Sequence, residues 1–265
     1  MLRKPAVAGA FYPSSKQELE KAVDLLLKRV DEKVFEGLDL SKAVAFVAPH
    51  AGYPYSGQVA AYTYRALSQA AKRGIETVVI IGPNHMGLGE FANVSLSDWE
   101  TPLGIAKNDI ELSRELCRQE PRFSTNEDEI AEEHSVEVQV PFIQQTLAGK
   151  KFAFICMSDQ SKEASKEVAE ALLKASEKLQ REIAVVASSD FDHYEPASVA
   201  ESKDMPAIKA LEKLDIDSFY RAAAAFFAKS KKAEKGVLLK YGNSGETTND
   251  YRSVVAYASI AFMKV

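Results

Sequence analysis

The stretch AVAFVAPHAGYPYSG, residues 43–57, begins as an apolar run and stops abruptly at Pro49. Directly after the proline the sequence presents His50, and it then turns through Gly52 and Pro54. A short apolar run bounded by turn residues is typical of a strand that is buried on both faces of a parallel sheet. The stretch therefore predicts a strand whose carboxyl end delivers a histidine.

The same arrangement occurs twice more along the chain. The stretch TVVIIGPNH, residues 77–85, ends at His85, and IAVVASSDFDHY, residues 183–194, delivers Asp190 and His193. In an open α/β sheet, ligands bind outside the carboxyl ends of the strands, where loops from different strands meet. Three of the four histidines in the chain are therefore expected around one crevice.

The spacing of apolar residues predicts alternating strands and helices. Strands are expected at residues 43–48, 77–81, 91–96, 151–157, 183–187 and 253–262. Helices are expected at residues 14–30, 56–72, 108–119, 134–147, 161–180, 205–213, 215–229 and 232–240. This alternation predicts a single α/β domain over residues 1–265, with a mainly parallel central sheet covered by helices on both faces.

The composition of the chain limits which partners and which cellular compartment are expected for it. The 265-residue chain is 46% hydrophobic and carries a net charge of −5, which argues against nucleic acid as its main partner. No apolar run approaches the roughly 18 residues of a membrane span. Cys117 and Cys156 lack a paired spacing, so both are expected to be reduced thiols of a cytoplasmic protein.

The strand-end residues suit metal chemistry, although each alone has an ordinary structural explanation. Imidazole binds Fe, Zn, Cu or Ni, and two histidines plus a carboxylate suit non-haem Fe(II). A further histidine beside such a metal can act as a general base. Asp190 would orient His193 if residues 190–193 turned helically, or it would serve as a turn cap. A lone histidine at a strand end is otherwise a surface or hydrogen-bonded residue.

Seven ordered motifs resemble those of the Memo-like family, also known as the AmmeMemoRadiSam system protein B family. They cover essentially the whole chain, and they are PAVAGAFYP (5–13), APHAGYPYSG (48–57), IGPNHMG (81–87), DWETPLG (98–104), EEHSVEVQVPF (132–142), SSDFDHY (188–194) and YGNSGETT (241–248). The family is similar in fold to class III extradiol ring-cleaving dioxygenases. Those enzymes bind Fe(II) through two histidines and a glutamate, and use another histidine as acid/base.

The resemblance implies a role for each matching residue. His50 and His85 correspond to the two histidine ligands, and His193 corresponds to the acid/base histidine. Asp190 corresponds to a family site aspartate. His134 lies in the EEHSVEVQVPF motif, and we group it with the catalytic residues.

The third metal ligand is where the sequence departs from its relatives. Animal Memo proteins carry a cysteine that can serve as ligand where this chain has Thr247. Glu246, one residue earlier, would restore a carboxylate, so the expected metal ligands are His50, His85 and Glu246. The expected metal is Fe(II) or Cu.

Three classes of function remain open on the sequence, which does not decide whether the chain is an enzyme. The first is a dioxygenase-like, metal-dependent oxidoreductase acting on an unknown small molecule. The second is a binding or adaptor protein that uses the same crevice for a small-molecule or peptide ligand. The third, taken from the family's name, is a partner of a radical SAM protein and an AMMECR1-like protein.

Overall fold

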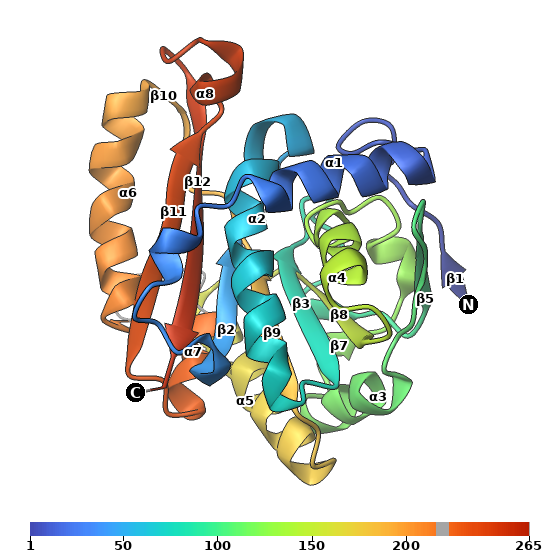
Figure 1. Cartoon of the computed structure of the whole chain (residues 1–265). Coiled ribbons are helices and arrows are strands. Elements are labelled where there is room, and N and C mark those ends of the chain that lie inside the picture. The colour runs from blue at the N-terminus through green and yellow to red at the C-terminus, as the bar shows by residue number, and fades with distance from the viewer. Residues whose placement is uncertain (216–222, 265) are drawn as a thin grey trace.

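The centre of the fold is a mixed β-sheet, seen in a computed structural model that describes residues 1–215 and 223–264 (Figure 1). Four neighbouring strands in its middle are parallel: β2 (Ala43–Ala48), β9 (Ile183–Ser188), β3 (Thr77–Pro83) and β8 (Lys151–Met157). Their carboxyl ends therefore meet at one edge, as the sequence predicts.

Antiparallel strands flank the parallel middle of the sheet, so the sheet as a whole is mixed and not purely parallel. On one side, β12 (Val254–Met263) is antiparallel to its three partners, which are β2, β10 (His193–Glu195) and β11 (Lys235–Asn243). On the other side β4 (Ala92–Val94) is antiparallel to β8, and β7 (Phe123–Ser124) is parallel to β4. A smaller sheet contains β1 (Leu2–Arg3), β5 (Asp98–Thr101) and β6 (Gly104–Ala106).

Helices cover both faces of the large sheet, as predicted. One face packs against α1 (Lys16–Lys28), α2 (Tyr53–Ala70) and α4 (Val140–Thr146). The other packs against α3 (Ile110–Gln119), α5 (Lys162–Lys178), α6 (Ala197–Glu212) and α7 (Ala223–Ser230). Val78 and Ile80 of β3 point to the first layer, whereas Val79 and Ile81 point to the second. The two-residue period of a strand thus supplies two apolar cores.

The remaining helical segments are short. They are α8 (Gly245–Thr248) and the 3₁₀ turns Glu32–Phe35, Leu40–Lys42, Ala71–Arg73, Glu127–Glu129 and Glu137–Gln139. The helix predicted from residue 134 begins only at the last of these turns, and Pro141 occupies the first turn of α4. Among the residues that the structure describes, no helix is long and apolar enough to cross a membrane.

Two predicted helices near the C-terminus need correction. Residues 232–240 are predicted as a helix, but most of them form β11, whose pairing with β12 shifts register between Leu238 and Lys240. The shift hides the two-residue period of a strand. The helix expected from residue 205 begins at Ala197, and part of the helix expected at 215–229 lies outside the described residues.

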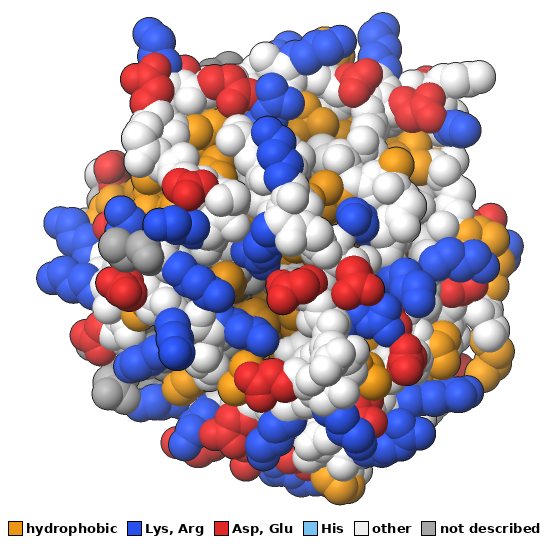
Figure 2. All heavy atoms as spheres, turned by 60° about the horizontal axis from the view of Figure 1, so that its bottom comes forward, with side chains coloured by type: hydrophobic (Ala, Val, Ile, Leu, Met, Phe, Trp, Pro, Cys, Tyr) orange, Lys and Arg blue, Asp and Glu red, His pale blue; other side chains and the backbone are white. Residues whose placement is uncertain are grey.

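The two edges of the parallel strands differ in character. At the amino edge, Lys and Arg side chains are numerous among acidic ones (Figure 2), and Lys42, Arg73, Lys231 and Lys264 line a pocket of about 240 Å³. Arg73 donates there to the carbonyl oxygens of Ala43 and Ile183, which gives it a structural role. The histidines lie at the opposite, carboxyl edge.

Candidate metal centre

Three histidines meet at the carboxyl edge of the sheet. One imidazole nitrogen from each of His50, His85 and His134 lies within 4.8 Å of the others, and we call these residues the histidine triad. The His85 and His134 rings are stacked, with centroids 4.5 Å apart, and His50 meets them edge-on at 5.2 and 5.7 Å. His50 follows β2, His85 follows β3, and His134 precedes α4. The fold therefore brings together three ligands that are far apart in sequence.

His50 is held by a buried network behind it. Its Nδ1 lies 3.0 Å from Oγ of Ser188, the last residue of β9. That hydroxyl donates to the carbonyl oxygen of Ser135 at 2.6 Å and accepts from Nε2 of Gln139 at 2.8 Å. Because the hydroxyl proton is already used, Ser188 accepts from His50, which assigns the imidazole proton to Nδ1. The Nε2 of His50 then carries the lone pair that a metal requires.

Glu133 holds the other two triad members. Its carboxylate is fully buried, lies 3.0 Å from Nδ1 of His85 and 3.5 Å from Nδ1 of His134, and accepts from the backbone nitrogens of His85 and Ser135. Burial acts to raise the pKa of Glu133, but these hydrogen bonds outweigh it and hold the pKa at about 2. An ionised acceptor beside both Nδ1 atoms leaves both Nε2 lone pairs for a metal.

His134 is a neutral imidazole at pH 7. Burial lowers its pKa to about 4, and nearby His50 and His85 act in the same direction against the charge of Glu133. Its ring contacts those of both His85 and Phe11, with centroids 4.5 and 4.7 Å away. A neutral, sterically fixed imidazole is the form that binds transition metals.

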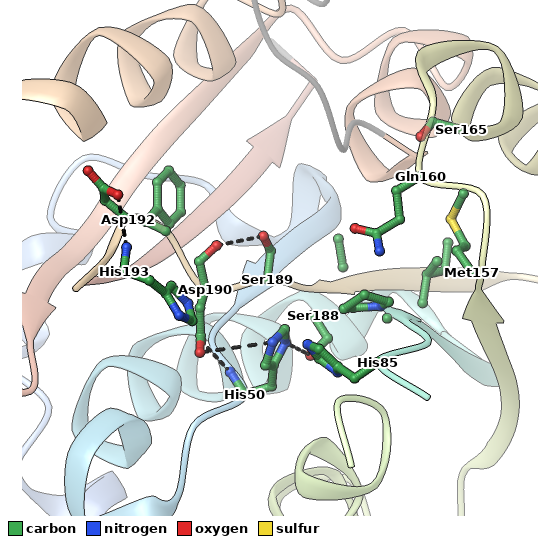
Figure 3. Close-up of a pocket in the computed structure, with 15 residues that line it drawn as sticks. His50, His85, Met157, Gln160, Ser165, Ser188, Ser189, Asp190, Asp192 and His193 are labelled. Atoms are coloured by element: carbon green, nitrogen blue, oxygen red, sulfur yellow. Dashed lines mark hydrogen bonds and ion pairs between the residues drawn. The ribbon is translucent and has the colours of Figure 1, made fainter. Parts of the chain in front are cut away.

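Asp190 is hydrogen-bonded to the backbone of His50, and the His193 side chain lies beside it (Figure 3). Its Oδ1 accepts from the backbone nitrogen of His50 at 2.8 Å, and its Oδ2 lies 3.9 Å from Nε2 of the same residue. Burial raises the pKa of Asp190 to about 6. The helical turn that would let Asp190 orient His193 is not formed, because residues 189–192 run toward β10, with Phe191 and Ala256 hydrogen-bonded through their backbones.

A pocket of about 450 Å³ opens beside the triad (Figure 3). His50, His85, Asp190 and His193 all line it, so the structure places these predicted residues along one cavity. Gln160 and Met157 lie on the side of the pocket opposite His193 (Figure 3). His193 is exposed and its imidazole is not part of the triad. It is therefore placed to meet a ligand in the pocket.

The predicted third ligand, Glu246, is not brought into the group. Its side chain is exposed, and its Oε1 accepts from the backbone nitrogen of Asn243 at 3.2 Å within its own loop. Thr247 donates to the carbonyl oxygen of Pro54 at 2.8 Å. Among the described residues, the potential metal-binding group consists of the histidine triad alone.

The donor set fits a transition metal. Three imidazoles suit Zn, Cu, Fe or Ni, and three protein ligands leave positions for water or substrate. The buried carboxylate of Glu133 and the buried hydroxyl of Ser188 complete the support that metal-binding histidines usually have. The triad can thus hold a metal ion, and its donors alone do not fix which one.

Glu133 and Ser188 are the residues that sequence reasoning missed. Glu133 adjoins His134, but a glutamate near a helix start is more often explained by the helix dipole. Ser188 stands beside Asp190 at the end of β9 and carries no pattern of its own. Their roles depend on contacts with residues 48 and 138 positions away, which no local pattern encodes.

Comparisons with known proteins agree with the motifs. The model of a family described as Memo-like protein matches residues 3–261. A MEMO1 family protein of Methanopyrus kandleri is 38% identical, with 100% of both chains covered. MEMO1 family proteins of Nitrosopumilus maritimus (35% identical, covering 99% of this chain and 100% of its own) and Methanocaldococcus jannaschii (38%, covering 97% and 98%) are similar in full length too. The chain belongs to the Memo-like family.

Proposed function

We propose that this protein is a metal-dependent oxidoreductase whose metal is held by His50, His85 and His134. The observation that carries the proposal is the approach of three imidazole nitrogens to within 4.8 Å of one another at the carboxyl edge of the sheet. Glu133 holds two of these rings, and a cation shared by all three imidazoles would account for the approach of His50 as well. The pocket beside them provides room for a small substrate.

The metal would supply Lewis acidity and access to a second oxidation state next to the pocket. Glu133 and Ser188 keep the Nδ1 protons in place and so keep the ligand rings oriented. His193 lines the same pocket from its exposed side and is the group proposed to accept a proton from substrate. Asp190 holds the backbone of His50 beside the metal ligands.

Copper is the metal that we favour over Fe(II). A three-imidazole set lacks the carboxylate of the facial triad that is typical of non-haem Fe(II) enzymes. For a given nitrogen site, divalent copper also binds more tightly than divalent iron. Fe(II) remains the expected metal only if Glu246 moves into the site when iron binds.

Metal titration of protein prepared without a histidine tag, under anaerobic conditions, tests the proposal. We expect one Cu or Fe(II) per chain in the wild type, and a loss of affinity of at least about tenfold in His50→Ala, His85→Ala and His134→Ala. His193→Ala serves as the matched control, because this histidine lines the pocket outside the triad. Wild-type protein that binds no metal, or four variants that behave alike, would overturn the proposal.

A binding role without redox chemistry is the second candidate. The 450 Å³ pocket supports it, since a pocket of this size can take a small molecule or the side chains of a peptide. The family resemblance also suggests a radical SAM protein and an AMMECR1-like protein as partners. Co-purification would test this proposal. The free thiols of Cys117 and Cys156 support the proposed cytoplasmic location.

A further inference from the structure

We propose that residues 3–12, which we call the N-terminal segment, position the histidine triad: Arg3 fixes the backbone of Glu133, and Phe11 fixes the ring of His134. The inference rests on the proposed function, because it assigns these residues a role toward the same metal site. Neither residue touches the pocket, so both would act through the residues that they hold. Two separate contacts, one at each end of the segment, lead to it.

The first contact is made by the buried guanidinium of Arg3. It donates to the carbonyl oxygens of Glu133 at 2.7 Å and Ile130 at 3.2 Å. It also lies 4.0 Å above the ring of Trp99, which restricts it to one orientation. Arg3 therefore holds the main chain of Glu133. The carboxylate of Glu133 in turn supports His85 and His134.

The second contact is made by Phe11, at the other end of the segment. Its ring packs against the ring of His134 in a tilted arrangement, with centroids 4.7 Å apart. Its carbonyl oxygen accepts from the backbone nitrogen of Tyr53 at 2.8 Å, directly after the turn that carries His50. Phe11 thus lies between the His134 loop and the His50 loop.

Glu137 joins the two ends of the segment. It is 1% exposed, and its carboxylate pairs with Arg3 at 2.7 Å and accepts from Tyr12 Oη at 2.6 Å. The backbone nitrogens of Ala6 and Val7 donate to it at 2.8 and 3.0 Å. Because every acceptor position of this carboxylate faces the segment, the segment can hold only one position relative to the triad.

A fork-shaped cation is required at position 3. Arg3 donates in three directions from a planar group, to Glu137, Glu133 and Ile130. A lysine keeps the charge but cannot reach three acceptors with that fixed geometry. Arg3→Lys should therefore preserve the ion pair with Glu137 while releasing the carbonyl oxygen of Glu133.

The test compares four single variants in two matched pairs, together with Arg3→Lys as a fifth variant. Arg3→Met is paired with Arg73→Met, because Arg73 also donates to two backbone carbonyls but lies at the opposite edge of the sheet. Phe11→Leu is paired with Phe35→Leu, because Phe35 is a buried ring that packs on Tyr62 away from the triad. Each pair removes similar contacts, apart from the ion pair of Arg3 with Glu137, and differs in what those contacts hold.

Two readouts separate positioning from general stability. The first is the imidazole NMR signals of His134 in metal-free protein, which we expect to shift or broaden in Arg3→Met and Phe11→Leu only. The second is Cu(II) affinity by chelator competition, expected to fall about tenfold in Arg3→Met, and by at least about threefold in Phe11→Leu and Arg3→Lys. Both arginine-to-methionine variants should unfold at a lower urea concentration than the wild type. A lower unfolding midpoint alone is therefore no evidence that the segment positions the triad.

The outcomes are distinguishable from failure of the proposed function. If the wild type binds neither Cu(II) nor Fe(II), the proposed function fails, and the His134 signals still decide whether the segment positions this ring. If Arg3→Met does not fold, Phe11→Leu decides, because it leaves the Arg3–Glu137 pair intact. Folded Arg3→Met and Phe11→Leu proteins with wild-type His134 signals and wild-type Cu(II) affinity would overturn the inference.

Discussion

Glu133 binds His85 twice: its carboxylate accepts from the backbone nitrogen of His85 and lies 3.0 Å from the Nδ1 of the same residue. The same carboxylate lies 3.5 Å from Nδ1 of His134, and it is fully buried. One anion thus fixes the rotation of two imidazoles that stack 4.5 Å apart. Without this acceptor, neither of the two neighbouring rings would have a defined tautomer.

Glu133→Gln tests this relationship. The amide has nearly the same shape but lacks the charge, and only one of its two polar atoms can accept a hydrogen bond. We expect Cu(II) affinity to fall about 10- to 100-fold, because the charge is lost and only one of the two hydrogen bonds from His85 can still be accepted. Chelator competition measures the affinity. Glu132→Gln is the control, since Glu132 is the adjacent, exposed glutamate, and equal affinity in the two variants would contradict the prediction.

The pH dependence of stability provides a second test, in metal-free protein. Folding lowers the pKa of His134 from 6.5 to about 4, so the unfolded chain binds the extra proton and stability rises with pH across this window. Folding raises the pKa of Asp190 from 3.8 to about 6, so the folded chain holds the extra proton and stability falls as pH rises. The two contributions oppose each other over nearly the same range.

Single substitutions should therefore reveal opposite slopes. Asp190→Asn leaves the His134 contribution, so the free energy of unfolding should rise between pH 4 and 6.5 relative to wild type. His134→Gln leaves the Asp190 contribution, so it should fall between pH 3.8 and 6. At about 1.4 kcal/mol per pKa unit, each change is at most about 3 to 4 kcal/mol. Urea unfolding at several pH values measures it, and parallel profiles in the two variants would show that these groups do not titrate as described.

Much of the fold could be predicted because each buried strand of a parallel sheet is a short apolar run that can be recognised in the local sequence. The runs 43–48, 151–157 and 183–187 are apolar apart from Lys151, and each is a strand in the structure. The run 232–240 could not be assigned in this way. Its side chains pack on both layers, and its strand character depends on pairing with β12, a long-range contact that local periodicity does not contain.

The location of the site could be predicted from the sequence, but the full set of its metal ligands could not. The carboxyl-edge rule and the family motifs both point to the pocket lined by His50, His85, Asp190 and His193. The position of His134 beside His50 depends on how the segment before α4 crosses the sheet edge, with Ser135 bonded to the end of β3. Such a crossing is a tertiary contact, so the ligand set could not be derived from spacing alone.

The close approach of the segment before α4 to the end of β3 leads to a prediction about Gly82. A β-carbon added at this glycine would lie 3.0 Å from Cβ of Ser135 and from Cγ2 of Val136, closer than side chains normally approach. Gly82→Ala should therefore cost about 1–3 kcal/mol in unfolding free energy. It should also weaken Cu(II) binding, because Ser135 donates its backbone N–H to Glu133 at 2.7 Å. Gly52→Ala is the control, as its nearest contact would be 3.4 Å away, and equal destabilisation of both variants would count against the crossing.

The third metal ligand is the point on which the sequence and the geometry give different candidates. The sequence favours a carboxylate from Glu246, whereas the structure places His134 with His50 and His85 and leaves Glu246 bonded to Asn243. We expect His134→Gln to lower Cu(II) affinity about tenfold or more, and Glu246→Gln to leave it within about twofold of wild type. Thr247→Ala is the loop control, because it removes only the hydrogen bond to Pro54.

Running the same titration with Fe(II) makes the comparison decisive. Iron favours a site with two histidines and a carboxylate, so a loop that moves on iron binding would make Glu246→Gln lose Fe(II) affinity while keeping Cu(II) affinity. A triad that is complete without Glu246 predicts that this variant keeps both, because all three imidazoles already converge within 4.8 Å. If instead His134→Gln keeps both metals and Glu246→Gln loses both, Glu246 is the third ligand. His134 would then be a neighbour of the metal site, and the resemblance to the dioxygenases would extend to the ligand set.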